Sequence, residues 1–476
     1  MKEDMTMQTQ FPKVELPQIP ERIYRIEDYG AVKGGEVSNT EAIRKAIEAA
    51  NEAGGGRVVV GAGIWLTGPV ELLSHVELHV EQGGLLLFHK HDEEYPLVRS
   101  NYEGESRIRA TSPIHAMDQT DIAITGKGVI DGNGQLWRMV KSMKLTAKQW
   151  EKLTKSGGVV AEGNDGPHWF PSEGSYLGHK VPNVDPEDPD WQAKAMQYFD
   201  YHRPVMVNLI RCKRVLIEDI TLQNSPAWNL HPIFCEHLTL RNAIIRNPWY
   251  AQNGDGLDLE SCRFVEIDGT SFDVGDDAIC MKAGKNAPAR KIPIPTEYVT
   301  IRNCVVYHGH GGFVVGSEMS RGVRHILVSN CLFIGTDVGI RFKSALGRGG
   351  VVEDITLDGI NMVNIENEAI IFTMGYTDAF DKNKAQTDDV PEFKNITIRN
   401  TVCRGAGRAL RVDGLAQLPI HDITLENVEL TAKTGFFCRE AENIHFQNVT
   451  IVDERDPERR LHYDQATFAG GDASEF

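Results

Sequence analysis

Cysteine is scarce in this sequence and is scattered singly: eight cysteines are spread over 476 residues. This pattern excludes a disulfide scaffold and contains no CxxC zinc motif. No apolar run approaches the roughly 18 residues that a membrane-spanning helix needs, and the amino terminus lacks the basic-then-apolar order of a signal peptide. We therefore expect reduced, buried thiols, no membrane partner, and a cytoplasmic location unless a leader was trimmed from the chain.

Basic residues are also in the minority. Asp and Glu outnumber Lys and Arg by 67 to 50, and the net charge is -17. A sequence-independent grip on nucleic-acid phosphates needs a basic surface, so nucleic acid is not an expected partner. We expect no cofactor and no metal, and the composition leaves the oligomeric state open.

One short phrase recurs between about residues 215 and 452: an alternating apolar and polar stretch, then Asn or Gly, then a second apolar stretch. The copies are ITLQNSP from Ile220, LTLRNAII from Leu238, VEIDGTSF from Val265, VTIRNCVV from Val299, ILVSNCLF from Ile326, ITLDGINM from Ile355, ITIRNTVC from Ile396, ITLENVEL from Ile423 and IHFQNVTI from Ile444. Such a strand cannot bury its apolar face alone, so the coils must stack. A sandwich would place its hairpin strands only two to five residues apart. The sequence therefore predicts an all-β fold, a parallel β-solenoid.

The chain divides around this solenoid. We expect an N-terminal extension over 1–22, a single β-helix catalytic domain over 23–452, a long loop inserted over about 141–201, and a polar tail over 453–476. Between Asn39 and Gly56, apolar residues at helical spacing predict a helix that covers the open end of the solenoid; they are Ala42, Ile43, Ala46, Ile47 and Ala50. Five cysteines at matching places predict stacked interior positions: Cys212, Cys235, Cys262, Cys304 and Cys331.

Four polar elements fall in consecutive repeats. They are Asn253-Gly254-Asp255-Gly256 with Asp258, Gly275-Asp276-Asp277, Gly309-His310-Gly311 and Arg341-Phe342-Lys343. If each interval is one coil, the elements stack at about 4.8 Å and bring three carboxylates, an imidazole and two cations to one outer face. Glycosidic hydrolysis needs such a set, because one carboxyl group must donate a proton while another activates water. Adjacent strand residues point to opposite faces, so Asp276 and Asp277 can both take part only if the chain bends, which Gly275 would permit.

In their order, these elements resemble the signature of glycoside hydrolase family 28, the polygalacturonase family: Asn-Thr-Asp, Gly-Asp-Asp, Gly-His-Gly and Arg-Ile-Lys. Gly254 and Phe342 depart from it, but every charged position matches. DYGAV from Asp28, TGKGVIDGNG from Thr125 and NSPAWNLHP from Asn224 extend the resemblance over most of the chain.

The resemblance is to bacterial exo-polygalacturonases. It implies a right-handed parallel β-helix and an inverting hydrolase acting on α-1,4-linked galacturonic acid units of pectin-derived oligo- or polygalacturonate. It also implies roles for particular residues. Asp276 would be the general acid, Asp255 and Asp277 would activate water, and His310 would tune the acid. Arg341 and Lys343 would hold the uronate carboxylate, and the other substrate-binding residues would be Tyr376, Asn253 and Asp258.

Two alternatives remain open. A β-helical pectate lyase would use the three aspartates as ligands for calcium, whereas a non-catalytic carbohydrate-binding solenoid would rely on exposed aromatics such as Trp228, Trp249 and Tyr250. Within the hydrolase hypothesis we expect attack from a chain end, because the 141–201 insertion could close one end of the cleft.

Overall fold

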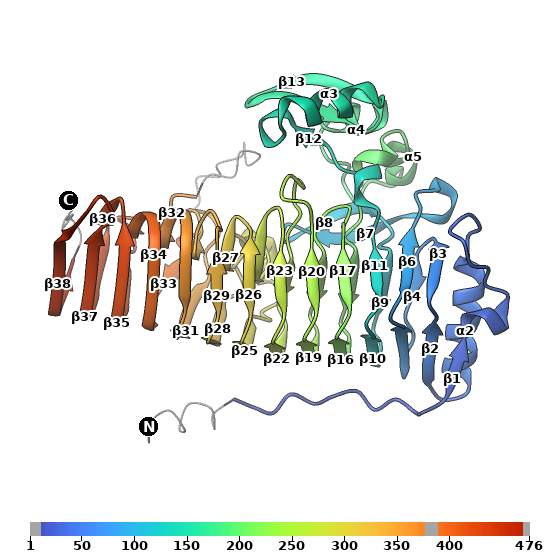
Figure 1. Cartoon of the computed structure of the whole chain (residues 1–476), viewed down its shortest axis with the longest axis horizontal. Coiled ribbons are helices and arrows are strands. Elements are labelled where there is room, and N and C mark those ends of the chain that lie inside the picture. Colours follow the sequence, from blue (N-terminus) through green and yellow to red (C-terminus); the bar gives the residue numbers. More distant parts are fainter. Residues whose placement is uncertain (1–10, 377–388, 470–476) are drawn as a thin grey trace.

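The computed structural model describes residues 11–376 and 389–469, which form a long solenoid of stacked strands (Figure 1). In these residues, 33 strands are hydrogen-bonded into one assembly. Each coil passes through three parallel sheets, which we number first, second and third in the order that the chain enters them. The fold is the expected right-handed parallel β-helix.

The strands of the three sheets are short and regularly spaced. The first sheet contains β1 (Ile23–Arg25), β2 (Gly56–Val60), β5 (Val76–Val80), β10 (Thr120–Thr125), β16 (Lys213–Glu218), β19 (Glu236–Arg241), β22 (Arg263–Asp268), β25 (Thr296–Arg302), β28 (Val323–Ser329), β31 (Val351–Asp358) and β33 (Glu392–Phe393). The second contains β3 (Gly63–Thr67), β6 (Gly84–Phe88), β11 (Val129–Asp131), β17 (Thr221–Gln223), β20 (Ile244–Arg246), β23 (Ser271–Asp273), β26 (Val305–His308) and β29 (Leu332–Ile334). The third contains β4 (Val70–Glu71), β9 (Ile114–Met117), β15 (Val207–Ile210), β18 (Leu230–Ile233), β21 (Leu257–Glu260), β24 (Asp277–Lys282), β27 (Gly311–Val315), β30 (Ile340–Lys343) and β36 (Thr434–Arg439).

Toward the C-terminus, single long strands run through more than one sheet. They are β32 (Asn361–Thr373), β34 (Ile396–Asp413), β35 (Ile420–Ala432) and β37 (Ala441–Asp453). The last strand, β38 (Asp456–Phe468), belongs to the segment expected as a polar tail and pairs antiparallel with β37. At the other terminus, residues 11–22 run as an extended chain along the solenoid (Figure 1), and the Glu15 backbone N–H donates to His237 Nδ1 at 3.2 Å.

The Asn or Gly of each repeated phrase marks the turn from the first sheet to the second. These residues adopt left-handed backbone, with φ of 51° at Asn242, 61° at Gly269 and 57° at Asn303, a conformation that Asn and Gly tolerate best. The predicted role of these residues is confirmed. The phrase from Ile220 is the exception: its Asn224 follows β17, one strand late, and Asp219 (φ 61°) makes the equivalent turn.

All eight cysteines are free and buried, as expected. The predicted stacked interior positions are confirmed, and they form two sets at different corners of the coil. Cys212, Cys235 and Cys262 directly precede first-sheet strands, whereas Cys304 and Cys331 directly precede second-sheet strands. Spacing along the chain could not separate the corners, because both lie beside the same strand of each coil.

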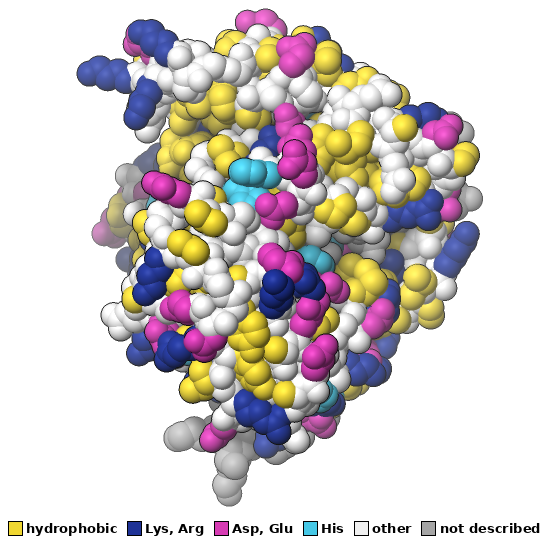
Figure 2. Space-filling view, turned by 90° about the vertical axis from the view of Figure 1, so that its right-hand side faces the viewer, with side chains coloured by type: hydrophobic (Ala, Val, Ile, Leu, Met, Phe, Trp, Pro, Cys, Tyr) yellow, Lys and Arg dark blue, Asp and Glu magenta, His cyan; other side chains and the backbone are white. Residues whose placement is uncertain are grey.

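Helix α2 (Thr40–Glu52) covers the N-terminal end of the solenoid, and its buried residues are those predicted from the helical spacing. Its outer face pairs Arg44 with Glu41 at 2.6 Å and with Glu48. Figure 2 looks onto this end, where acidic and basic side chains are interspersed over the surface. No helix in residues 11–376 and 389–469 is long and apolar enough to span a bilayer.

The segment expected as a long loop has secondary structure of its own. It contains β12 (Val140–Lys141), β13 (Val159–Gly163) and β14 (Gly166–Phe170), an antiparallel sheet above the solenoid (Figure 1), with α3 (Ala147–Lys155), α4 (Glu173–Gly178) and α5 (Trp191–Met196). Single-turn helices complete the chain: η1 (Ile26–Tyr29), η2 (Asp92–Glu94), η3 (Gly134–Leu136), η4 (Ser142–Lys144), η5 (Phe199–Tyr201) and the short α6 (Asn286–Arg290). The prediction of a loop was wrong, because this segment lacks the solenoid period on which the sequence interpretation depended.

The third sheet differs from the second in its burial. All residues of β15, β18, β21, β24 and β27 are buried, so both faces of these strands are covered. In contrast, β17, β20 and β23 each bury only their central residue. The third sheet is therefore where the solenoid carries additional structure on its outer face.

Candidate active site

The four polar elements do stack on consecutive coils, at the start of the third-sheet strands. The strand register places Leu257 beside Ile279, Asp277 beside Gly311, and Val314 beside Arg341. As a result, Asp255, Asp276 and Asp277 each present a carboxylate oxygen within 4.8 Å of the others.

Both aspartates of the Asp276-Asp277 pair reach this cluster because the alternation of side chains breaks at the start of β24. Ala278 and Ile279 are adjacent, yet both are completely buried in the core. The glycine before the pair works by close approach: a Cβ on Gly275 would lie 2.6 Å from the carbonyl oxygen of Pro248. Only glycine allows the two loops to pack this closely.

Asp277 is held by two cations from β30. Lys343 Nζ lies 2.7 Å from Asp277 Oδ2, and Arg341 Nη1 lies 3.5 Å from Oδ1. Burial would raise the pKa of Asp277, but Lys343 and Arg341 outweigh it and lower this pKa. The ring of Tyr376 lies near the same cations, 5.0 Å from Lys343 Nζ and 5.8 Å from the Arg341 guanidinium.

Asp276 forms an ion pair with His310. The His310 Nδ1 to Asp276 Oδ1 distance is 3.0 Å, and the His310 backbone N–H donates to the Asp276 carbonyl at 2.9 Å. Asp276 raises the pKa of His310. Burial opposes ionisation of Asp276, but His310 and then Lys343 hold the pKa of this carboxyl below its usual range.

Asp255 has the opposite environment. It is 4% exposed, and its Oδ1 has no hydrogen-bond partner among the described residues. Burial, followed by the charges of Asp276 and Asp258, raises the pKa of Asp255 well above its usual range. This shift favours the protonated form of Asp255, whereas the family resemblance gives the proton-donating role to Asp276.

Asp258, expected to contact substrate, lies beneath the site. Its exposure is 0%, and Lys282 Nζ lies 3.6 Å from its Oδ1. Lys282 also pairs with Glu318 at 2.8 Å. Asp258 thus faces the buried charges of Lys282 and Glu318, because it lies within β21, whose residues are all buried.

The sequence analysis did not identify three residues that contribute to the site: Arg203, Lys144 and Lys282. Arg203 donates to Asn253 Oδ1 at 2.8 Å and to the Gln252 carbonyl at 2.9 Å, and thereby fixes the loop before Asp255. Lys144, from the insertion, lies close enough to Asp276 to lower the pKa of that carboxyl. Lys282 could have been predicted, because it lies on the same strand as Asp277. Arg203 and Lys144 could not, because neither belongs to a repeated phrase.

A hairpin of β7 (Leu97–Tyr102) and β8 (Glu105–Ala110) builds the wall beside Asp255. The ring of Tyr102 packs on Trp228 at 4.3 Å between centroids, and Lys282 Nζ lies 4.9 Å from the centroid of Trp228. At the tip, the carbonyl of Gly104 accepts from the Lys285 backbone N–H at 3.2 Å. The hairpin thus reaches from the coil of β9 to the end of β24.

The base of this hairpin packs on the insertion. A buried cluster joins the two segments: Tyr95, Leu97, Ile108, Ala110, Trp137, Ala195 and Phe199. The hairpin and the insertion therefore form one structure that covers the third sheet. Of the aromatics named for a binding solenoid, Trp228 is 2% exposed beneath the hairpin and only Trp249, at 50%, is open to solvent.

The chain is similar to known carbohydrate-cleaving enzymes in sequence and in structure. Residues 153–451 match the model of glycosyl hydrolases family 28. The chain is 28% identical to an exo-poly-alpha-D-galacturonosidase of Dickeya chrysanthemi, over 91% of this chain and 71% of that protein. It is 27% identical to a probable polygalacturonase of Vitis vinifera, over 88% and 77%. A hyperthermoactive exopolygalacturonase from Thermotoga maritima superposes with a TM-score of 0.79 and 29% identity, covering 98% of each chain. The family match spans more than half of the sequence, and the chain belongs to glycosyl hydrolases family 28.

Proposed function

We propose that this protein hydrolyses α-1,4-linked galacturonic acid units of pectin-derived oligo- or polygalacturonate, starting from a chain end. The observation that carries the proposal is the cluster of Asp255, Asp276 and Asp277, with His310 and two cations set around it. The named activities of the Dickeya and Thermotoga relatives support the same substrate.

The carboxyl groups divide the chemistry between a proton donor and a water-activating base. Asp276 Oδ1 lies 3.0 Å from His310 Nδ1, so a proton held by this pair can be delivered to the leaving oxygen. Asp277, whose pKa is lowered by Lys343, is the base that can accept a proton from water, and the family resemblance assigns Asp255 to the same water. Arg341, whose side chain is 21% exposed, is the freer of the two cations for a substrate carboxylate.

Partners of the aspartates favour hydrolysis over a calcium-dependent lyase. Both oxygens of Asp277 face cations, at 2.7 and 3.5 Å, and Oδ1 of Asp276 faces His310. Calcium takes six to eight oxygen ligands, and here the nearest positive charges are already supplied by side chains. Hydrolysis should therefore survive a chelator and leave no product that absorbs in the ultraviolet.

Attack at a chain end is supported by the hairpin wall. The β7–β8 hairpin covers the third sheet on one side of Asp255 and is joined to the coil of β24 through Gly104 and Lys285. We expect this wall to stop a long polymer, so that a chain end is presented to the aspartates.

The stereochemical course gives the first test. The nearest oxygens of the three carboxylates are within 4.8 Å, which is below the roughly 6.5–9.5 Å usual for inverting enzymes. We propose inversion, as the family resemblance implies. Proton NMR of the earliest product from an α-linked substrate should show the β-anomer; an α-anomer at that time would assign a retaining mechanism.

Paired variants should separate the acid from the base. Asp276→Asn should lower turnover of a galacturonate oligomer by at least about 10²-fold, because proton donation is lost. The same variant should lose much less on an aryl galacturonide whose leaving group needs no proton. Asp255→Asn should impair both substrates. If only Asp255→Asn recovers on the aryl substrate, the raised pKa of Asp255 marks the true donor and the two roles exchange.

Arg341 and Lys343 should respond differently to the charge of the substrate. Arg341→Ala should raise KM for the free acid more than for its methyl ester, because the ester has no carboxylate to pair. Lys343→Ala should impair both substrates, since it leaves the buried carboxylate of Asp277 without its partner at 2.7 Å. Steady-state kinetics on both substrates measure this contrast. Equal damage by Arg341→Ala on acid and ester would remove it as the uronate anchor.

Attack from a chain end can be tested with an oligogalacturonide that is labelled at its reducing end. The unaltered protein should shorten it stepwise, with no mid-length labelled products at early times. Deleting Glu103 and Gly104 from the hairpin tip should allow such products. Deleting Glu454 and Arg455, in the turn between β37 and β38, is the matched control and should not. Early mid-length products from the unaltered protein would show internal cleavage and refute attack from a chain end.

A further inference from the structure

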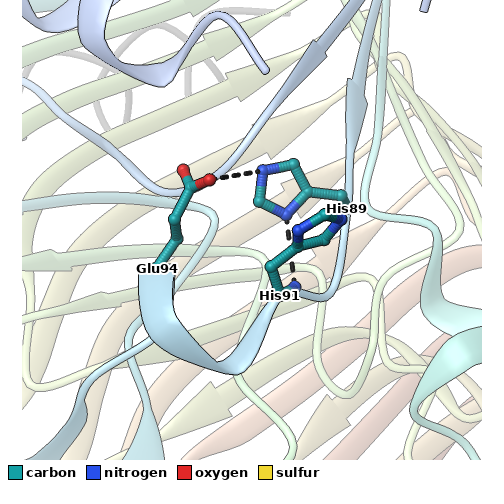
Figure 3. A group of neighbouring side chains, drawn as sticks. All are labelled: His89, His91 and Glu94. Atoms are coloured by element: carbon teal, nitrogen blue, oxygen red, sulfur yellow. Dashed lines mark hydrogen bonds and ion pairs between the residues drawn. The ribbon is translucent and has the colours of Figure 1, made fainter. Parts of the chain in front are cut away.

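A second group of metal-binding side chains lies at the N-terminal end of the solenoid, in the turn after β6. His89, His91 and Glu94 each present one potential ligand atom, and these atoms lie within 4.8 Å of one another. Figure 3 shows the His89 ring facing the carboxylate of Glu94, with the His91 ring beside it. The group is on an early coil, whereas the catalytic aspartates are on the coils of β21 and β24.

The spacing of the inner two ligands suits a tetrahedral ion. His89 Nε2 and Glu94 Oε1 are 3.3 Å apart. Two ligands with zinc bonds of about 2.0–2.1 Å and tetrahedral angles are separated by about 3.3–3.4 Å. His91 is exposed and can adjust its ring, whereas His89 is 4% exposed and fixed. Only the His91 side chain would therefore have to move for the three residues to bind one ion.

Neighbouring hydroxyl groups hold the carboxylate in place. Thr40 Oγ1 donates to Glu94 Oε2 at 2.5 Å, and Ser38 Oγ lies 3.2 Å from His89 Nε2. With Oε2 occupied, Oε1 is left facing the imidazole. Hydrogen bonds of this kind orient ligands in metal sites.

Contacts on both ring nitrogens orient His89. The His91 backbone N–H donates to His89 Nδ1 at 3.3 Å, so Nε2 carries the ring proton toward Glu94. A metal would take the place of the Nε2 proton, and the long bond to Nδ1 would be released as that nitrogen becomes protonated.

We propose that His89, His91 and Glu94 bind one Zn²⁺, with water as the fourth ligand. Two imidazoles and a carboxylate are a zinc-type donor set. His91 is exposed, so the ion can reach the site from solvent. Bound zinc would tie the turn before the β7–β8 hairpin to the start of α2, through Thr40, and so stabilise the base of the cleft wall.

Zinc titration of the whole, chelator-treated protein tests this proposal. Calorimetry with Zn²⁺ should give one ion per chain, and the unfolding temperature should rise with zinc, because ligand binding to the folded state stabilises it. His91→Ala and Glu94→Gln should abolish both effects. Glu93→Gln, the adjacent exposed residue with the same loss of charge, is the matched control and should retain them.

The catalytic aspartates are a second cluster that could take up the ion, so Asp255→Asn is included. Stoichiometric binding that persists in Asp255→Asn and disappears in His91→Ala supports the site. Absence of stoichiometric zinc in the unaltered protein, binding that survives His91→Ala, or binding lost in Asp255→Asn overturns it. His91 is exposed, so its substitution should leave circular dichroism unchanged, and hydrolysis of galacturonan by His91→Ala should match the unaltered protein at low temperature.

Discussion

The backbone hydrogen bonding between successive third-sheet strands is the constraint on which the rest of the molecule depends. It sets Asp277 beside Gly311 and Val314 beside Arg341, so side chains from different coils meet at fixed spacing. Each coil carries one polar element, and none of these elements is sufficient alone. The aspartates can be crowded together because Lys343, Arg341 and His310 arrive by the same register and compensate their charge.

The cover over the third sheet is made by segments that do not belong to the solenoid. The β7–β8 hairpin and the 141–201 insertion leave the coil, pack on each other and cover the third sheet. This cover lowers the polarity around Asp255 and raises its pKa, whereas the cations near Asp276 and Asp277 act in the opposite direction. The same packing therefore both covers the third sheet and sets the pKa values of the three aspartates.

Periodicity explains which features could be predicted from the sequence. The strands, the turns at residues such as Asn242 and Asn303 and the helical face of α2 all repeat with a period, so the alternating pattern revealed them. Arg203 and Lys144 belong to segments without a period, and their contacts depend on how those segments fold back. The burial of Asp258 was missed for a related reason: alternation assumes one solvent-exposed face, and the third sheet has none there.

The coil-by-coil origin of the aspartates, His310 and the cations also determines which changes in chain length the enzyme tolerates. A residue added within a loop, as between β24 and β25, is absorbed at the surface, since the next strand can still enter its place in the stack. A whole coil inserted between β24 and β27 would preserve the hydrogen bonding and the core. It would, however, move His310 about 4.8 Å further from Asp276 and separate the ion pair. Duplication of coils, an easy route by which solenoids lengthen, is therefore compatible with this protein's function only outside the stretch from β21 to β30.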